Sequence, residues 1–199
     1  MQRRSSPGYT LLLALSAVVG FAYLAPGTHA EDAAPVLLSA KVIADFSAGA
    51  GDWRSRQWQE DGSATMGDLQ PGILPEALGG GPCIELPVSF PTKLEVVSPT
   101  AELWTGWQAL RVRLYLPPNL PQTTIITVFT KDWDHLWRQI RLPAPPQRNQ
   151  LVDVTVPIAG QDAVRQWEAC GHERPWNQTT PRSLLEFGVS IEPETGSTT

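Results

Sequence analysis

The chain of 199 residues carries a net charge of −5 and contains 19 prolines, 16 glycines and eight tryptophans. This length suits one domain with a sizeable core. The acidic balance, without any cluster of Lys and Arg, argues against nucleic acid and anionic membranes as partners.

The first thirty residues have the parts of a secretory signal. Arg3 and Arg4 give a positive start, an apolar stretch covers residues 11–24, and a cleavage site ends at Ala30. We therefore expect cleavage after Ala30 and a secreted or periplasmic protein, with an uncleaved anchor as the alternative. The stretch is shorter than the roughly 20 residues of a spanning helix, and no second one follows, so no membrane span is expected after cleavage. Without the two arginines the net charge falls by two, to −7.

Residues 31–191 have the pattern of one antiparallel β-sandwich. In segment 109–116, apolar residues at even positions alternate with Arg111, Arg113 and Tyr115, which places the two sets on opposite faces of a strand. A short helix is predicted at 161–168, and Gly- or Pro-rich turns occur at 79–82 and 143–146. Further strands are predicted at 41–46, 83–88, 123–130, 136–142, 151–158 and 185–191. The predicted fold class is therefore all-β.

The C-terminal segment 192–199 loses the hydrophobic pattern, so we expect a flexible tail. No strand pattern follows Ile191, although a sandwich would usually continue into a closing strand. We expect either a fragment of a longer protein or a variant whose sheet edge is completed differently.

The two cysteines, Cys83 and Cys170, both follow the predicted signal. In an oxidising compartment an isolated pair usually forms a disulfide. The loop that it would close is long, so the chain-entropy model gives a stabilisation on the order of 4–5 kcal/mol. Two free thiols are the alternative.

The order of motifs over residues 40–191 resembles that of jelly-roll domains grouped as galactose-binding-like folds and carbohydrate-binding modules. The motifs are an Asp45-Phe46 strand before Gly51-Asp52-Trp53, a Trp107-Gln108-Ala109 entry to a strand, Lys131-Asp132-Trp133-Asp134 after the next strand, and a Trp176 loop before Phe187-Gly188-Val189. The resemblance implies a jelly roll that binds carbohydrate and requires no cofactor. It also implies a structural calcium held partly by a closing strand. Because that strand is missing here, the sequence leaves a calcium site open, with Asp45 as one potential ligand.

One candidate sugar site is the segment that follows the predicted 123–130 strand. Sugars stack their C–H faces on aromatic rings while polar side chains bind the hydroxyls. This segment combines both kinds of side chain in Asp132, Trp133, Asp134, His135 and Trp137. The alternative is that the two rings only cover the end of the core.

A second candidate is the polar side of two strands. Arg111, Arg113 and Tyr115 share one side of their strand, and we expect them to lie near Gln139 and Arg141 of another strand. Together these side chains could bind sugar hydroxyls. The alternative is a solvated face held by cross-strand ion pairs.

These observations favour a secreted, non-catalytic β-sandwich that binds carbohydrate, alone or as a module of a larger carbohydrate-active protein. The alternative is an exported structural or protein-interaction sandwich. A third hypothesis is a jelly-roll glycoside hydrolase or polysaccharide lyase, which would need Asp132, Asp134, His135 and Tyr115 to converge in one groove. None of the common catalytic or phosphate-binding motifs occurs in the sequence. Exposure of two or more Trp rings on one platform would distinguish a binder from a structural protein.

Overall fold

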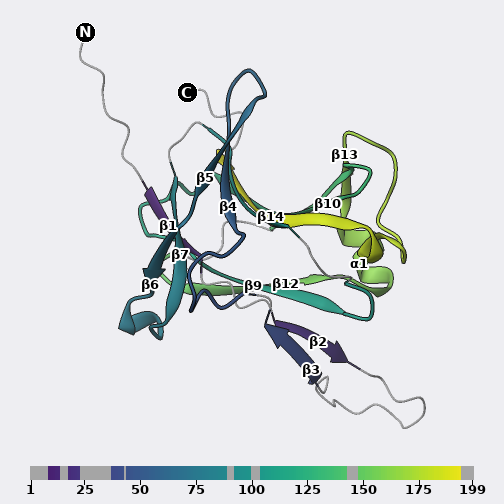
Figure 1. The fold of residues 1–199 in the computed structure, drawn as a ribbon, viewed down its shortest axis with the longest axis horizontal. Helices are drawn as coiled ribbons and strands as arrows, with labels where there is room; N and C mark the ends of the chain where they lie inside the picture. Colours follow the sequence, from purple (N-terminus) through teal and green to yellow (C-terminus); the bar gives the residue numbers. More distant parts are fainter. Residues whose placement is uncertain are drawn as a thin grey trace.

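The computed structural model describes residues 9–13, 18–22, 37–42, 44–88, 92–99, 104–142 and 148–193. These residues form two antiparallel sheets that pack face to face, with the sheet of β10 and β14 above that of β9 and β12 in Figure 1. The predicted all-β sandwich is confirmed. In the described part of the chain, no helix is long and apolar enough to cross a membrane.

The first sheet, called sheet A, has the strand order β3-β2-β9-β1-β7-β6, and β12 pairs with the other edge of β9. Its strands are β1 (Tyr9–Leu13), β2 (Val18–Ala22), β3 (Leu37–Val42), β6 (Gln70–Ile73), β7 (Pro82–Val88), β9 (Ala109–Tyr115) and β12 (Leu151–Pro157). Strands β1 and β2 lie within the segment predicted as a signal. β1 pairs with both β7 and β9, so it occupies the place between them.

The second sheet, called sheet B, has the strand order β13-β11-β10-β14-β8-β4-β5. Its strands are β4 (Arg54–Trp58), β5 (Ala64–Asp68), β8 (Leu94–Pro99), β10 (Thr124–Asp132), β11 (Trp137–Arg141), β13 (Glu168–Cys170) and β14 (Leu184–Pro193). Three short helices complete the elements: η1 (Glu76–Leu78), α1 (Gly160–Gln166) and η2 (Thr180–Arg182).

The core lies between the two sheets and follows from the alternation of apolar side chains along the strands. Leu110, Val112 and Leu114 of β9 are fully buried, as the period-two pattern predicts. They belong to one cluster with Val128 of β10 and Val189 of β14. Because successive residues of a strand point to opposite faces, the residues that precede and follow Val128 and Val189 in the sequence lie on the side of sheet B that faces away from sheet A.

Four of the eight Trp residues pack inside this core. Trp53 and Trp104 both contact the ring of Phe187 edge-on, at centroid distances of 5.0 and 4.9 Å. Trp167 and Trp176 stack at 4.5 Å, and their indole N–H groups donate to the carbonyls of Pro157 and Ile158. All four rings are buried, and the N–H groups of Trp167 and Trp176 are satisfied, so these residues have structural roles.

The predicted disulfide is wrong. Cys83 lies on β7 of sheet A and is fully buried beside Leu74, whereas Cys170 lies on β13 at the edge of sheet B. Both thiols are free. Burial raises the pKa of the Cys83 thiol, which keeps it protonated and unreactive.

Two predicted boundaries also differ from the structure. The strand predicted at 41–46 is observed as β3, which ends at Val42, and Phe46 adopts a positive φ of 55° in a turn. At the other end of the chain, β14 continues to Pro193, two residues past the predicted limit, because its backbone still pairs with Thr124 of β10. The rest of the predicted tail, 194–199, lies outside the described residues.

Candidate ligand-binding face

The side of sheet B that faces away from sheet A carries charged side chains that are buried among aromatic ones, whereas charged residues on an outer face are usually exposed. Paired residues on neighbouring strands share a face, so the successive partners Met66, Arg56, Glu95, Ser190 and Thr127 form one row across it. Glu95, Ser190 and Thr127 are buried although they lie on this outer side. Larger neighbouring side chains therefore cover the middle of the face.

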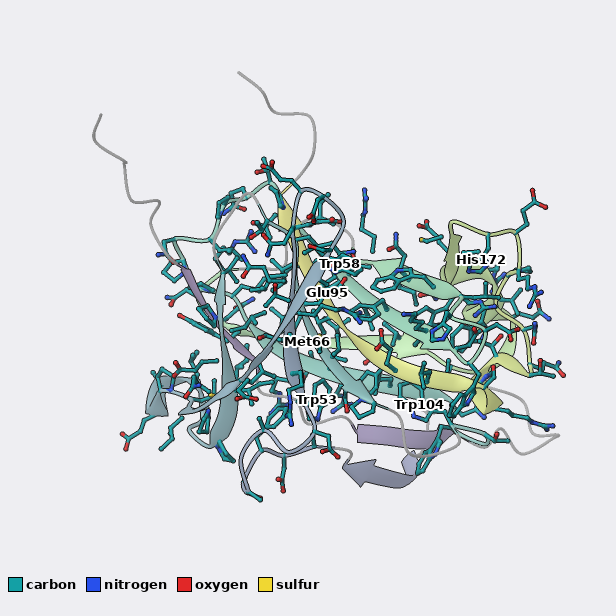
Figure 2. All side chains as sticks on the ribbon, turned by 45° about the horizontal axis from the view of Figure 1, so that its top comes forward. Trp53, Trp58, Met66, Glu95, Trp104 and His172 are labelled. Carbon is teal, nitrogen blue, oxygen red and sulfur yellow. The ribbon has the colours of Figure 1, made fainter. Side chains whose placement is uncertain are left out.

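At the centre of the face is a group that we call the Arg56 cluster. Its members come from five strands or their ends: Arg56, Trp58, Lys93, Glu95, Phe129, Trp137 and Glu186. In Figure 2 the labelled Trp58 and Glu95 lie together, apart from the core residues Trp53 and Trp104.

Two carboxylates hold the Arg56 guanidinium in place. Its Nε donates to Glu95 at 2.6 Å and its Nη1 donates to Glu186 at 2.9 Å. The other oxygen of Glu95 lies 3.1 Å from Lys93 Nζ, in a geometry that gives an ion pair without a directed hydrogen bond. Burial opposes the charge on Arg56, but the attraction of Glu95 and Glu186 is stronger and raises its pKa. The guanidinium is therefore a fixed cation.

Aromatic rings surround the same guanidinium. Arg56 Cζ lies 5.6 Å from the centroid of Trp58, 5.7 Å from that of Phe129 and 5.9 Å from that of Trp137. Phe129 and Trp137 stack at 4.1 Å with nearly parallel planes. Lys93 Nζ lies over the outer rings, 4.8 Å from Trp137 and 6.0 Å from Trp58. Such cation–π contacts contribute roughly 0.5–2 kcal/mol each, depending on desolvation.

Gly188 makes this arrangement sterically possible. It pairs with Phe129 on β10, and a Cβ at position 188 would lie 2.8 Å from the Phe129 ring and would also meet the Val96 carbonyl. The Phe129 ring therefore lies across β14 at a position where any side chain would displace it. Trp137, which stacks on Phe129, depends on the same space.

Four buried polar atoms on this face have no hydrogen-bond partner among the described residues. They are Arg56 Nη2, Trp58 Nε1, Glu95 Oε1 and Ser190 Oγ, and Glu95 Oε1 has only its ion pair with Lys93. An unpaired buried polar group costs about 1–3 kcal/mol, so most native proteins hold few of them. Four on one face are unusual. Arg56 Nη2, Trp58 Nε1 and Ser190 Oγ are groups that a bound ligand could satisfy.

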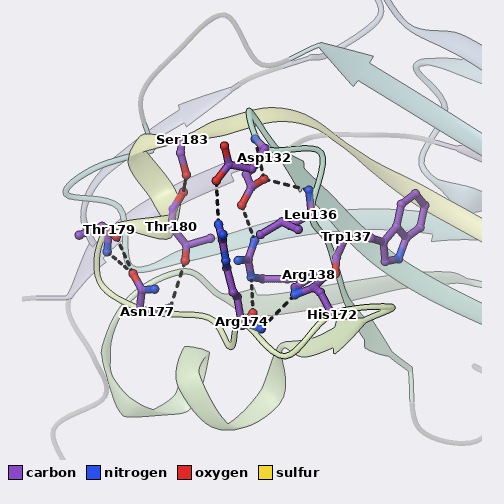
Figure 3. A network of polar contacts seen from close by, with 11 residues as sticks. Asp132, Leu136, Trp137, Arg138, His172, Arg174, Asn177, Thr179, Thr180 and Ser183 are labelled. Carbon is purple, nitrogen blue, oxygen red and sulfur yellow. Dashed lines mark hydrogen bonds and ion pairs between the residues drawn. The ribbon is translucent and has the colours of Figure 1, made fainter.

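The predicted 132–138 segment is a tight turn in which Asp132 has a structural role. Its Oδ1 accepts hydrogen bonds from the backbone N–H groups of Asp134 and Leu136, and its Oδ2 accepts one from Arg138 at 2.8 Å. Burial opposes the charged form, but these bonds outweigh it and lower the pKa of Asp132. The buried Arg138 also donates to the carbonyl of Arg174, as Figure 3 shows.

The other predicted residues of this turn point in different directions. Trp133 is 67% exposed, whereas Trp137 is half-buried against Phe129, so the two rings form no common platform. Asp134 pairs with the exposed Arg174 at 2.9 Å. His135 is exposed and takes a positive φ of 61° at the tip of the turn.

A polar cleft of about 350 Å³ lies beside this turn. Asp132, Arg138, Arg174 and Thr180 are among its lining residues, and Figure 3 shows how most of their polar groups bind one another. His172 accepts from the Arg174 N–H through Nδ1 and contacts the Trp137 carbonyl through Nε2 at 2.7 Å. These internal bonds mainly hold the loop to β11.

The second predicted site is divided between the two sheets. Arg111, Arg113 and Tyr115 lie on β9 of sheet A, whereas Gln139 and Arg141 lie on β11 of sheet B. The expectation that they meet was wrong, because β9 pairs with β12 and not with β11.

On sheet A these residues have local partners. Arg113 forms two bonds with Asp153, at 2.8 and 3.1 Å, and these lower the pKa of Asp153. Tyr115 donates to Asn149, and Arg111 is exposed. This is the solvated face with cross-strand ion pairs that the sequence left as the alternative. Tyr115 is thus on a different sheet from Asp132, Asp134 and His135, so the four residues nominated for catalysis do not converge.

Gln139 and Arg141 belong to the outer face of sheet B. Gln139 pairs with Phe129 and accepts a hydrogen bond from Trp137 Nε1 at 3.3 Å, and Arg141 pairs with Thr127. The structure thus places Trp137, Gln139 and Arg141 on the candidate face and the other predicted ligand residues elsewhere.

Within the described ranges, no group of three or more His, Cys, Asp or Glu side chains could hold a metal ion. Asp45, the potential calcium ligand, accepts hydrogen bonds from the backbone and hydroxyl of Ser47. These bonds lower its pKa and account for its local role in the turn.

Sequence reasoning missed Arg56, Trp58, Lys93, Glu95 and Glu186. Two weak signals were present: Arg56 and Trp58 alternate within a short segment, and Glu95 interrupts an otherwise apolar run. Neither signal shows that the two segments are neighbours in a sheet.

The chain matches no known protein-family model, no curated protein and no solved structure.

Proposed function

We propose that this protein is a secreted carbohydrate-binding β-sandwich whose ligand lies on the outer face of sheet B. The observation that carries the proposal is the Arg56 cluster, in which two half-buried indole rings flank a buried guanidinium with an unpartnered N–H. Rings and fixed donors side by side match the two surfaces of a sugar, its C–H face and its hydroxyls.

Rigidity of the face also supports binding. Arg56 is held by two carboxylates and three rings, so it would lose little conformational entropy when a ligand arrives. The resemblance of the sequence to galactose-binding-like domains and carbohydrate-binding modules agrees with the proposal. Sugar would bind with modest affinity, because an open face remains largely wet.

Secretion is a separate part of the proposal and rests on the signal-like residues 1–30. Intact-mass analysis of protein recovered from the medium or periplasm tests it. A mature chain that begins at Glu31, and therefore lacks β1 and β2, is the expected result. An uncleaved chain in the cytoplasm would contradict it.

Binding is tested with a glycan array and pull-downs on insoluble polysaccharides, using the purified chain. Two variants distinguish the candidate platforms: Trp137→Ala removes a ring of the Arg56 cluster, and Trp133→Ala removes the exposed ring of the turn. We expect retention on at least one glycan, at least tenfold weaker binding by Trp137→Ala, and unchanged binding by Trp133→Ala.

Other results would change the proposal in defined ways. Loss of binding in Trp133→Ala alone would move the site to the turn. Absence of binding to every glycan by a folded protein would favour the structural or protein-interaction hypothesis, in which all eight rings only pack.

A further inference from the structure

The unpartnered polar atoms on the outer face of sheet B indicate which ligand chemistry this face would suit. Arg56 Nη2 and Trp58 Nε1 can only donate hydrogen bonds, and Ser190 Oγ can donate or accept. Three acceptors of the same face already accept hydrogen bonds: Oε2 of Glu95, Oε1 of Glu186 and Oε1 of Gln139. The remaining oxygen of Glu95 accepts none and lies 3.1 Å from Lys93 Nζ. At the centre of the face, the unpaired donors therefore lack acceptors, while the one unpaired carboxylate oxygen already faces a cation.

The donors lie close enough to act on one sugar unit. Arg56 and Glu95 are directly paired, as are Glu95 and Ser190, so Arg56 and Ser190 are two strand spacings apart, about 10 Å between Cα atoms. The long Arg56 side chain covers much of this interval, since its guanidinium reaches Glu186 on β14. Trp58 is two residues from Arg56 and lies on the same face of β4.

Charged side chains of both signs lie around the cluster; the exposed Glu168 pairs with Gln139, and the nearest cations are Lys93 and Arg141. The Lys93 side chain is 30% exposed and lies over the rings of Trp58 and Trp137, and the exposed Arg141 lies farther along the same face. A long lysine can swing away from the rings toward an anion. Its movement would uncover the faces of Trp58 and Trp137.

We propose that the ligand is an acidic sugar, such as a uronic acid unit of a polysaccharide, whose carboxylate accepts hydrogen bonds from Arg56 and Trp58. This inference rests on the proposed carbohydrate-binding function and names the class of sugar. A carboxylate only accepts hydrogen bonds, so it fits a face that offers donors, and bonds to a charged acceptor are stronger than those to a neutral hydroxyl.

A structural origin for the same donors predicts a different response to mutation. Trp58→Phe keeps a ring but removes the indole N–H, and Ser190→Ala removes only the hydroxyl. If these groups serve only the fold, removing an unsatisfied group changes nothing but stability. If they bind the ligand, both variants keep or gain thermal stability and lose affinity.

The experiment measures binding of the full chain, as its host processes it, to polygalacturonate, alginate and glucuronoxylan. Each polymer is paired with its carboxyl-reduced form, which keeps the sugar and removes the charge. We expect at least one acidic polymer to bind at least tenfold more tightly than its reduced form and to bind more weakly as salt rises. Trp58→Phe and Ser190→Ala should each weaken that binding about tenfold. Trp107→Phe, the same change at the end of the sandwich, should leave it unaltered.

Equal binding of acidic and reduced polymers would overturn the acidic-sugar inference and leave carbohydrate binding intact. Unchanged affinity in both Trp58→Phe and Ser190→Ala would also overturn it. Absence of binding to any glycan, acidic or neutral, would refute the proposed function itself.

Discussion

The buried position of the Arg56–Glu95 pair can be tested by removing one charge. Glu95→Gln keeps the shape of the side chain but leaves Arg56 with one carboxylate, Glu186, and removes the charge partner of Lys93. The Glu95 side chain is fully buried and that of Arg56 is 11% exposed, so water cannot replace the lost interaction.

Removing one partner of a buried ion pair generally costs about 3–5 kcal/mol, because the remaining charge stays buried. Arg56 keeps Glu186, so we expect the lower part of this range or less, about 2–3 kcal/mol. For a domain of this size that corresponds to a fall in Tm of about 5–10 °C. Thermal and urea unfolding, followed by circular dichroism, measure both quantities.

Asp153→Asn provides the matched control. The Arg113–Asp153 pair has similar distances, but its side chains are 38% and 42% exposed, so solvent screens the charges. The expected loss is at most about 1 kcal/mol. Equal losses in Glu95→Gln and Asp153→Asn would refute the claim that the Arg56 cluster is buried and preorganised.

Three further predictions concern the framework around the face. Gly188→Ala should lower the free energy of unfolding by about 1–3 kcal/mol or more, because the added methyl group displaces the Phe129 ring. The near-UV circular dichroism signal should also decrease. A variant as stable as the parent would contradict the close contact between Gly188 and Phe129. The pKa of Asp132 is lower in the folded protein than its ordinary value of 3.8. The charged carboxylate therefore stabilises the fold above pH 3.8, and this contribution is lost as the pH falls through the folded-state pKa. Asp132→Asn should remove that part of the acid-induced loss of stability. Thiol titration of the denatured protein without reductant should find two free thiols. In the native protein, half-buried Cys170 should react before buried Cys83. Fewer than two thiols after denaturation would support the disulfide that the sequence predicted.

The strands that sequence predicted well are those whose apolar side chains alternate against a core. β9 and β12 were located to within one or two residues, because period-two burial is a local pattern. β4 was missed, since Arg-Ser-Arg-Gln-Trp has no apolar alternation. Its outer residues are stabilised by Glu95 and Glu186, which are 39 and 130 residues from Arg56 in the chain. Local patterns carry no information about such partners.

For the same reason, sequence placed Gln139 and Arg141 correctly on one face of one strand, which is β11. Trp137 shares that face, although the sequence analysis assigned it to a platform with Trp133. Their neighbours on this face depend on the order of strands in sheet B, which places β14, β8 and β4 beyond β10. The predicted platform at Trp133 failed because Asp132 closes the turn tightly and directs that side chain into solvent.

The most direct test of carbohydrate binding at this face is an NMR titration that follows the indole N–H signals of the eight Trp residues. The probes are soluble oligosaccharides, both neutral and uronate-containing, added to the ¹⁵N-labelled protein. We expect the signals of Trp58 and Trp137 to shift with saturation while those of the core residues Trp53 and Trp104 remain in place. Saturable shifts confined to Trp133, or no shift at Trp58 and Trp137 with any sugar, would contradict the proposed binding face.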